Sequence, residues 1–261
     1  MMRRKFLASS LAAAAASAVT LPRESVAQPA AGREYYDLRK YTLQSGPQTK
    51  LAAEYFEKAL IPALNRLGIT PVGAFSVDVG PETPTIYLLL PCKNLQTLVT
   101  AELLLAKDEV FVKAAAPFWA APAGAPAFKR VESTLFSAFE GHPAVTPPAK
   151  GKRIFQLRTY ESPSNAAHIA KVKMFHSGEF EIFARAGCGQ VFYGDALIGQ
   201  NLPNLTYMLT FPDLATLQTC WKAFSADPEW KKLSADPTFA YESIVSNITN
   251  LYLNPTSYSQ I

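Results

Sequence analysis

An internal duplication is the feature that most restricts how this chain can fold. The segment Leu38–Tyr41 (Leu-Arg-Lys-Tyr) returns as Leu157–Tyr160 (Leu-Arg-Thr-Tyr), a shift of 119 positions. The same shift aligns Asn94–Leu98 with Asp213–Leu217. A repeated unit of roughly 110 residues is too long for a solenoid repeat and has the size of a small α/β domain. The duplication therefore predicts two similar units in one chain.

The first residues have the composition of an export signal. Arg3–Leu7 is a charged segment with the twin-arginine pattern, and an apolar run follows over Leu11–Val19. Small residues stand at the two positions before Gln28 that a signal peptidase recognises. The alternative is a retained anchor helix, but the apolar run is well short of the ~20 residues that a span needs. We therefore predict a twin-arginine signal peptide over residues 1–27, a periplasmic mature protein and no stable membrane anchor after cleavage.

The charge of the mature chain argues against some partners. The sequence has 25 basic and 21 acidic residues; the predicted signal contains four of the basic and one of the acidic residues, which leaves 21 against 20. A nearly neutral chain gives no reason to expect binding to nucleic acid or to an anionic membrane. A small-molecule ligand and a homo-oligomer remain open as partners.

Hydrophobic periodicity gives the two units the same order of elements. Strands are predicted at 35–42, 72–79, 85–90 and 130–139, and again at 153–160, 190–195, 205–211 and 241–253. Helices are predicted at 48–67, 94–106, 164–186 and 213–224, with loop or turn at 117–126 and 228–233. Pro62 predicts a kink or an early end of the first helix. The proline-rich segment 142–152 is typical of a linker, so the predicted repeats are 34–141 and 153–255.

The order strand, helix, strand, strand, helix, strand is that of a ferredoxin-like unit. The four-stranded sheet of such a unit has helices on one face and leaves the other face bare. Two units in one chain can therefore pack bare face to bare face. We predict an α+β fold in which two tandem ferredoxin-like (βαββαβ) units form a fused dimeric α/β-barrel pseudo-dimer.

Several segments resemble the NIPSNAP family. Both copies contain the opening Leu-Arg-x-Tyr strand, and the second copy adds further family segments: Val191–Gly194, Leu197–Gly199, Pro203–Leu209, Asp227–Trp230 and Ile244–Ile248. The resemblance covers most of residues 34–255. It implies a dimeric α/β-barrel fold of ferredoxin-like units and no established enzymatic activity. Proteins with this wider fold include cofactor-independent monooxygenases and haem-binding proteins, which is an analogy at the level of the fold alone.

Two arginines are the first candidate ligand-binding residues. Residues two apart on a strand share a face, so Arg39 lies on the face of Tyr41, and Arg158 on the face of Tyr160. The apolar side chains of Leu38, Phe155 and Leu157 point the other way and are assigned to the helix-packed face. The four polar residues are then expected to line a space between the two sheets. Two guanidinium groups with phenol hydroxyls beside them can hold a carboxylate or phosphate bidentately.

The alternative for these arginines is structural. Each can pair with a carboxylate of its own copy, such as Glu132 or Glu242. An unpaired buried arginine costs several kcal/mol, so some partner is required.

His176, Glu179 and Tyr160 are the catalytic candidates. His176 lies on an apolar stripe of the helix predicted at 164–186, and Glu179, three residues further on, can reach it. A histidine and a carboxylate beside a cavity can transfer protons, with Tyr160 as a further proton handler. The alternative is a hydrogen-bonded packing histidine.

Neither a metal nor a cofactor is predicted. The three histidines are dispersed and the cysteines lack metal-binding spacing. One histidine suffices as an axial haem ligand, so haem binding stays open. Cys92, Cys188 and Cys220 are expected to be buried thiols, with one disulfide as the alternative in an oxidising periplasm.

Two functions follow as hypotheses, beside a third in which the protein is an adaptor whose bare sheet edges recruit other proteins. The first is an exported protein that binds a small apolar or acidic molecule between its two sheets. The second is a cofactor-independent monooxygenase or isomerase that uses the same cavity. A cavity filled by side chains would argue against both.

Overall fold

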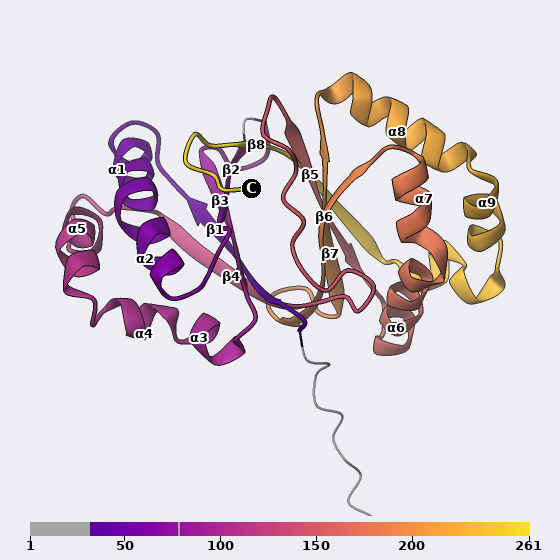
Figure 1. The fold of residues 1–261 in the computed structure, drawn as a ribbon, viewed down its shortest axis with the longest axis horizontal. Helices are drawn as coiled ribbons and strands as arrows, with labels where there is room; N and C mark the ends of the chain where they lie inside the picture. Colours follow the sequence, from indigo (N-terminus) through magenta and orange to yellow (C-terminus); the bar gives the residue numbers. More distant parts are fainter. Residues whose placement is uncertain (1–31, 78) are drawn as a thin grey trace, which may run out of the picture. The chain divides into compact units, whose positions relative to one another are not determined.

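Eight antiparallel strands close into one barrel in the computed structural model, which describes residues 32–77 and 79–261 (Figure 1). The predicted signal peptide at 1–27 lies outside the described residues. In their order around the barrel the strands are β1 (Tyr35–Thr42), β3 (Thr85–Cys92), β2 (Gly73–Val77), β8 (Asn247–Pro255), β5 (Ile154–Glu161), β7 (Asn204–Phe211), β6 (Gly189–Ile198) and β4 (Arg130–Ala138). The predicted α+β barrel is confirmed.

The two halves of the barrel have the same strand order. The first half runs β4-β1-β3-β2 and the second runs β8-β5-β7-β6. If the strands of each half are numbered 1 to 4 along the chain, both halves have the order 4-1-3-2. The pairs β2–β8 and β4–β6 join the halves. Each sheet therefore has one face toward the barrel interior and one face toward its own helices.

Helices cover the outer faces of both sheets (Figure 1). On the first half these are α1 (Pro47–Tyr55), α2 (Ile61–Arg66), α3 (Leu95–Val99), α4 (Ala101–Leu105) and α5 (Glu109–Trp119). On the second half they are α6 (Asn165–Met174), α7 (Phe180–Arg185), α8 (Leu214–Ala226), α9 (Pro228–Ser234) and α10 (Tyr241–Ile244), with a short 3₁₀ turn, η3 (Pro237–Phe239).

A π-helical turn interrupts the long helix of each half at the same place. The turns are η1 (Phe56–Leu60) and η2 (Phe175–Glu179), again 119 positions apart. In the first half the helix continues past Pro62, which stands at the start of α2 directly after the π turn. A proline lacks the amide donor that a regular helix interior requires, and a π turn is a common place to absorb such a defect. The helix is therefore interrupted at Pro62 without ending there.

An ion pair is also repeated at the same spacing. Arg66 pairs with Asp108 in the first half, and Arg185 pairs with Asp227 at 3.1 Å in the second. Asp108 and Asp227 also cap the N-termini of α5 and α9 through their side chains, which satisfies amide groups that a helix leaves unpaired. The duplication read from the sequence thus persists in three dimensions.

Three apolar clusters form the core. One lies between the first sheet and its helices, and a second lies between the second sheet and its helices. The third fills the barrel interior with residues from both halves, among them Tyr36, Leu38, Phe75, Phe155 and Leu157. Both faces of each sheet are therefore buried.

Three predicted segments differ from the structure. Helix α5 extends to Trp119 and includes Pro117, which was predicted as loop. Residues 228–234 form helix α9 where a turn was predicted. The predicted strand 241–253 begins as the short helix α10 and becomes β8 only at Asn247. Within the described residues, none of the helices combines the length and apolar character needed to cross a membrane.

Candidate functional site

The strands that carry the candidate arginines have the opposite orientation to the one predicted. The alternation itself is correct, since Leu38 and Leu157 lie on one face and the arginines on the other. The leucines, however, lie in the barrel interior, while Arg39 contacts helix α4 and Arg158 contacts helix α8. The prediction that Arg39, Tyr41, Arg158 and Tyr160 line one cavity between the sheets is therefore wrong.

The barrel interior leaves little room for a ligand. Large buried side chains from both halves fill most of it, including Tyr36, Phe75 and Phe155. A cavity of about 200 Å³ remains at one end, with Lys40, Thr159 and Thr206 among its lining residues. A larger cavity lies outside the barrel.

The larger cavity, which we call the first-half pocket, has a volume of about 590 Å³. It lies between the outer faces of β1 and β4 and helices α3 to α5. Its lining residues are Asp37, Arg39, Tyr41, Tyr55, Leu98, Val99, Glu102, Phe118, Trp119, Phe128, Val131, Ser133, Leu135 and Ile198. Ile198 belongs to β6, so the second half closes one edge of this pocket.

Aromatic side chains form much of the pocket wall. The rings of Tyr55 and Phe118 stack at 4.0 Å between centroids, and Phe118 also stacks on Phe128 at 5.7 Å. The indole Nε1 of Trp119 donates a hydrogen bond of 3.0 Å to the Tyr55 hydroxyl. Burial raises the pKa of Tyr55 and of Tyr41, so both phenols keep their protons at neutral pH. The wall is apolar and uncharged.

An ion cluster of two buried side chains and the half-exposed Glu102 forms the polar part of the first-half pocket. Arg39 donates from Nε to Asp37 at 2.6 Å and from Nη1 to Glu102. The second oxygen of Asp37 accepts from Ser133 Oγ at 2.6 Å. Burial alone would lower the pKa of Arg39, but the negative charges of Asp37 and Glu102 outweigh it and the pKa is raised. Arg39 is therefore a paired cation.

The structural alternative for Arg39 is thus correct in kind but wrong in its partner. Its carboxylates are Asp37 and Glu102, whereas the predicted partner Glu132 pairs with Lys40 at 3.3 Å. Glu102 was missed because it comes from a different element, helix α4, and strand periodicity carries no information about it.

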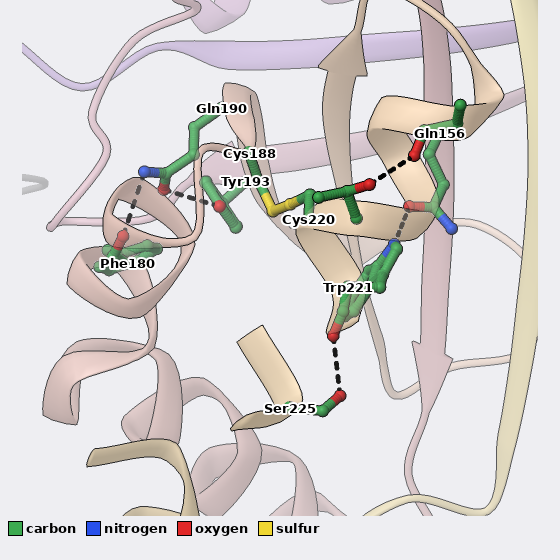
Figure 2. The surroundings of a disulfide bond; sticks show 10 residues. Gln156, Phe180, Cys188, Gln190, Tyr193, Cys220, Trp221 and Ser225 are labelled. Atoms are coloured by element: carbon green, nitrogen blue, oxygen red, sulfur yellow. Dashed lines mark hydrogen bonds between the residues drawn. A yellow bond between two sulfur atoms is a disulfide. The ribbon is translucent and has the colours of Figure 1, made fainter. Parts of the chain in front are cut away.

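The corresponding arginine of the second half, Arg158, packs against Trp221. Its ring centroid lies 4.4 Å from the guanidinium carbon of Arg158, and its Nε1 donates to Gln156 Oε1 at 2.7 Å (Figure 2). By the shift of 119 positions, Gln156 stands where the first half has Asp37, and Trp221 where it has Glu102. The second half therefore has an amide and an indole at the positions where the first half has two carboxylates.

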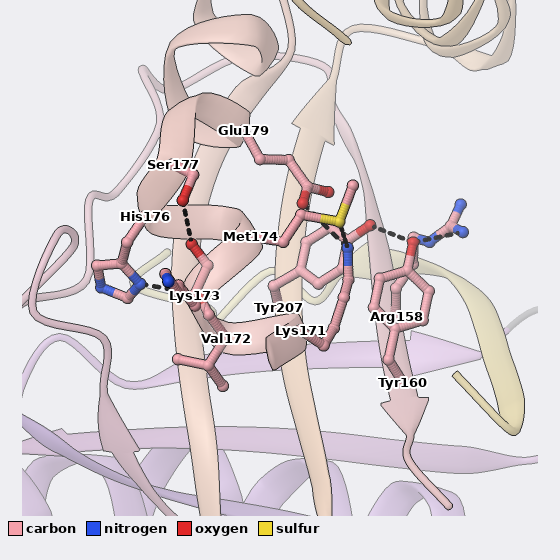
Figure 3. Close-up of polar contacts among 10 residues, drawn as sticks. All are labelled: Arg158, Tyr160, Lys171, Val172, Lys173, Met174, His176, Ser177, Glu179 and Tyr207. Carbon is pink, nitrogen blue, oxygen red and sulfur yellow. Dashed lines mark hydrogen bonds and ion pairs between the residues drawn. The ribbon is translucent and has the colours of Figure 1, made fainter. Parts of the chain in front are cut away.

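Arg158 consequently has no acidic partner among residues 32–77 and 79–261. It donates from Nη2 to the Tyr160 hydroxyl at 2.9 Å, and that hydroxyl lies 3.1 Å from the Tyr207 hydroxyl (Figure 3). Burial raises the pKa of Tyr160 to about 12, although Arg158 acts to lower it. The predicted partner Glu242 does not pair with Arg158.

A buried ion pair lies next to these tyrosines. Lys171 Nζ and Glu179 Oε2 are 3.0 Å apart, and both side chains are almost completely buried, at 3% and 2% exposure. Lys171 Nζ also lies 4.5 Å from the centroid of the Phe175 ring. Burial raises the pKa of Glu179, while Lys171 acts to lower it. Figure 3 shows this pair beside Tyr207.

The predicted contact between His176 and Glu179 is absent. His176 is exposed, its Nδ1 lies 2.9 Å from the Val172 carbonyl oxygen, and its Nε2 accepts from the Gly141 amide at 3.2 Å. Because Gly178 in the π turn has φ of 124°, the two side chains do not follow regular helical spacing. Glu179 points to Lys171, and His176 points away from that pair (Figure 3). The His176 ring lies 5.4 Å from the Phe139 ring and 5.3 Å from the Phe180 ring, so it is a hydrogen-bonded histidine packed on aromatic side chains. His176, Glu179 and Tyr160 do not form one constellation.

Two of the three cysteines are joined. Cys188 and Cys220 form a disulfide with their Cα atoms 5.7 Å apart (Figure 2). The bond links helix α8 to the residue before β6. Cys92 is buried and free. The expectation of three buried thiols is therefore wrong for Cys188 and Cys220, and the alternative of one disulfide is correct. Within the described residues, no group of three or more histidine, cysteine or acidic side chains is placed to hold a metal ion.

The fold and these sites define an α/β barrel made of two halves with the same strand order, with a pocket beside Arg39 in the first and an indole packed on Arg158 in the second. A family comparison matches residues 36–121 and 155–260 to NIPSNAP, which is more than half of the chain. The chain therefore belongs to the NIPSNAP family.

Solved structures share the fold at low sequence identity. A Fusobacterium nucleatum protein whose monooxygenase assignment is provisional aligns with a TM-score of 0.58 and 8% identity, covering 86% of this chain and 93% of that one. A provisionally assigned monooxygenase from Lactobacillus acidophilus aligns with a TM-score of 0.55 and 10% identity, covering 85% and 94%. An uncharacterised NIPSNAP-like domain protein from Burkholderia xenovorans is 20% identical over 43% of this chain and 92% of its own, with a TM-score of 0.38. The comparison with curated proteins found no match.

Proposed function

We propose that this protein binds a small, largely apolar molecule in the first-half pocket. The observation that carries the proposal is the aromatic cavity of about 590 Å³ outside the barrel. Sites for small molecules in proteins are concave, mostly apolar and roughly 300–1,000 Å³ in volume, with a few polar groups that orient the ligand. The first-half pocket has this size and composition, and its polar groups are Asp37, Arg39, Glu102 and Ser133.

The contrast between the halves supports the proposal. In the second half Trp221 and Gln156 occupy the positions of Glu102 and Asp37, and a hydrogen bond joins them. An aromatic cavity beside Arg39, where the second half has an indole packed against its arginine, is not required by the fold. Its retention in the first half favours a ligand there.

The proposal is tested by native mass spectrometry of the purified full-length chain. We expect a small molecule to travel with the wild type and to be lost from Val131→Trp. Val131 lies on the pocket-lining face of β4 and is 37% exposed, so a larger ring can enter the cavity. The matched control is Leu214→Trp in the second half, which is also exposed and lines no part of this pocket. Equal ligand retention in both variants would contradict the proposed site.

A cofactor-independent monooxygenase or isomerase is the second candidate. The fold similarity to two provisionally assigned monooxygenases is the observation that favours it. Its proposed proton handlers lie in the second half, away from the first-half pocket, and His176 is exposed. Oxygen uptake by the protein loaded with its ligand, together with an NMR spectrum of the recovered ligand, separates the two candidates: a monooxygenase consumes oxygen, an isomerase changes the ligand without consuming oxygen, and a binding protein leaves both unchanged.

We also infer that the two halves are tandem ferredoxin-like units. The equal strand order, the paired π turns and the repeated arginine–aspartate ion pairs support this inference. A protease site inserted in the linker at 142–152 tests it. After cleavage the two fragments should remain associated through β2–β8 and β4–β6, and each should keep its helical signal once they are separated in denaturant and refolded.

Export to the periplasm through the twin-arginine route is a further part of the proposal. The sequence pattern at 1–27 supports it, and so does the disulfide between Cys188 and Cys220, because such bonds persist in oxidising compartments. Replacing Arg3 and Arg4 together by lysine should retain the protein in the cytoplasm of a bacterial host. Normal periplasmic recovery of that variant would contradict the twin-arginine route.

A further inference from the structure

We infer that the first-half pocket selects a ligand with a positively charged group, such as a protonated amine, on an aromatic or apolar body. This inference rests on the proposed function and specifies its ligand class. It differs from the acidic ligand that the two arginines suggest in the sequence.

The charge of the pocket is the first argument. Of the described residues that line it, three are charged: Asp37, Arg39 and Glu102. One guanidinium faces two carboxylates, so the pocket has a formal charge of −1 when all three are ionised. A ligand cation restores neutrality, and a ligand anion adds to the excess.

The second argument is that Arg39 already has two carboxylate partners. Its Nε is bonded to Asp37 and its Nη1 to Glu102, and its side chain is only 8% exposed. An incoming carboxylate at this guanidinium would lie beside both of these carboxylates, and because like charges repel, their presence opposes its binding.

The third argument is that Glu102 can accept another hydrogen bond. Both carboxylate oxygens of Asp37 already accept, one from Arg39 and one from Ser133. Glu102 uses Oε1 for Arg39, and Oε2 has no hydrogen-bond partner within the described part of the chain. Its side chain is half exposed, at 51%. Glu102 is therefore the group that meets the charged end of the ligand.

The aromatic wall suits the same ligand class. Tyr55, Phe118, Trp119 and Phe128 line the pocket with the ion cluster. The faces of aromatic rings attract cations within about 6 Å, by roughly 0.5–2 kcal/mol each. A protonated amine attached to a flat apolar body can contact Glu102 at one end and the rings along its length.

The second half lacks the two carboxylates and therefore their negative charge. There Gln156 and Trp221 are neutral and Arg158 has no acidic partner among residues 32–77 and 79–261, so that half has no excess of negative charge to attract a cation. The two halves thus provide an internal comparison in one chain.

Three probes of the same shape test the inference: naphthylmethylamine, naphthylmethanol and naphthoate. Titration calorimetry with the full-length protein at pH 7 measures each affinity. We expect the amine to bind tightest and the carboxylate weakest, with about a tenfold difference or more between them, the size expected for a hydrogen bond to a charged group. Raising the salt concentration should weaken the amine more than the alcohol.

Glu102→Gln removes the charge and keeps the shape. It should lower the affinity for the amine about tenfold and leave the alcohol within about twofold. Glu109→Gln, on the exposed first turn of α5 and outside the pocket lining, is the matched control and should change neither affinity. The ranking of the probes on the wild type does not depend on any variant, so it stands even if Glu102→Gln is unstable.

The outcomes separate the inference from the proposed function. Equal binding of the three probes, or tightest binding of naphthoate, with loss of binding in Val131→Trp, would overturn the charge selection and leave the pocket as the ligand site. Absence of saturable binding by every probe, together with no ligand in native mass spectrometry, would overturn both.

Discussion

Glu102 and Trp221 occupy equivalent positions in the two halves, and each contacts the arginine of its own half. Glu102 accepts a hydrogen bond from Arg39, whereas the ring of Trp221 lies 4.4 Å from the guanidinium of Arg158. The two equivalent arginines thus have different surroundings: Arg39 belongs to an ion cluster beside a pocket, and Arg158 packs against an indole. This difference makes the two halves of the barrel structurally unequal.

Removal of the indole hydrogen bond should destabilise the second half. Trp221→Phe keeps a ring over Arg158 but leaves the Gln156 oxygen without its donor, and we expect a loss of about 1–2 kcal/mol in the free energy of unfolding. Trp221→Ala removes the ring as well and should cost about 2–4 kcal/mol. Urea denaturation measures both. Equal stability of the wild type and Trp221→Phe would show that the contact to Gln156 is not formed.

The disulfide should contribute to stability. Cys188 and Cys220 are separated by 32 residues, and closing a loop of this length in the unfolded chain stabilises the native state by about 2–4 kcal/mol. We expect dithiothreitol to lower the urea midpoint of the wild type to that of the double variant Cys188→Ala, Cys220→Ala. Cys92→Ala, which removes the free cysteine, should keep the sensitivity to reductant. A midpoint that does not respond to reductant would contradict the bond.

The buried ion pair of Lys171 and Glu179 predicts a change in stability that can be compared with the first half of the same chain. The first half has Ala52 and Leu60 at the positions of Lys171 and Glu179, and both are buried. Lys171→Ala alone leaves Glu179 without its partner and should cost about 3–5 kcal/mol. The double variant Lys171→Ala, Glu179→Leu restores the first-half pair and should recover most of that loss. A double variant as unstable as the single one would show that the lysine matters for packing and not for charge.

The same pair predicts a pH dependence. Burial raises the pKa of Glu179 above its ordinary value of 4.5, so the folded protein binds a proton more tightly than the unfolded chain does. The contribution of this group to stability is complete below that value and is lost as the pH rises through the raised pKa. Lys171→Ala removes the charge that lowers this pKa, so its stability should fall more steeply between pH 4.5 and 7 than that of the wild type. Unfolding curves at a series of pH values, with the double variant as control, measure this; parallel curves for the single and double variants would contradict it.

The duplication and most of the fold could be predicted from sequence, because the 119-residue shift and the strand alternation are local patterns. Which face of β1 and β5 lies toward the barrel interior could not be predicted. Alternation identifies a sheet face by its apolar residues, but here Leu38 lies in the barrel interior, Tyr41 packs under the helices, and both are buried. A period-two pattern does not tell which of two buried faces points inward.

The candidate site depended on contacts between distant segments. Arg39 was found from its repeated motif, whereas Glu102 and Trp119 come from helices packed over the strand and have no shared spacing with it. The substitution of Glu102 by tryptophan at the duplicated position was visible in the sequence, and it is the signal that could have identified the unequal halves. The position of His176 was predicted wrongly because it lies in a π turn that also contains Gly178 at positive φ, and regular helical spacing does not apply there.

The number of ligands bound per chain is the decisive measurement, because the first half has a pocket beside Arg39 and the second half has Trp221 packed against Arg158. Native mass spectrometry of the full-length protein with saturating naphthylmethylamine measures this number. We expect one bound amine per chain in the wild type and none in Glu102→Trp, which gives the first half the side chain of the second. Two amines per chain, or one that persists in Glu102→Trp, would contradict it.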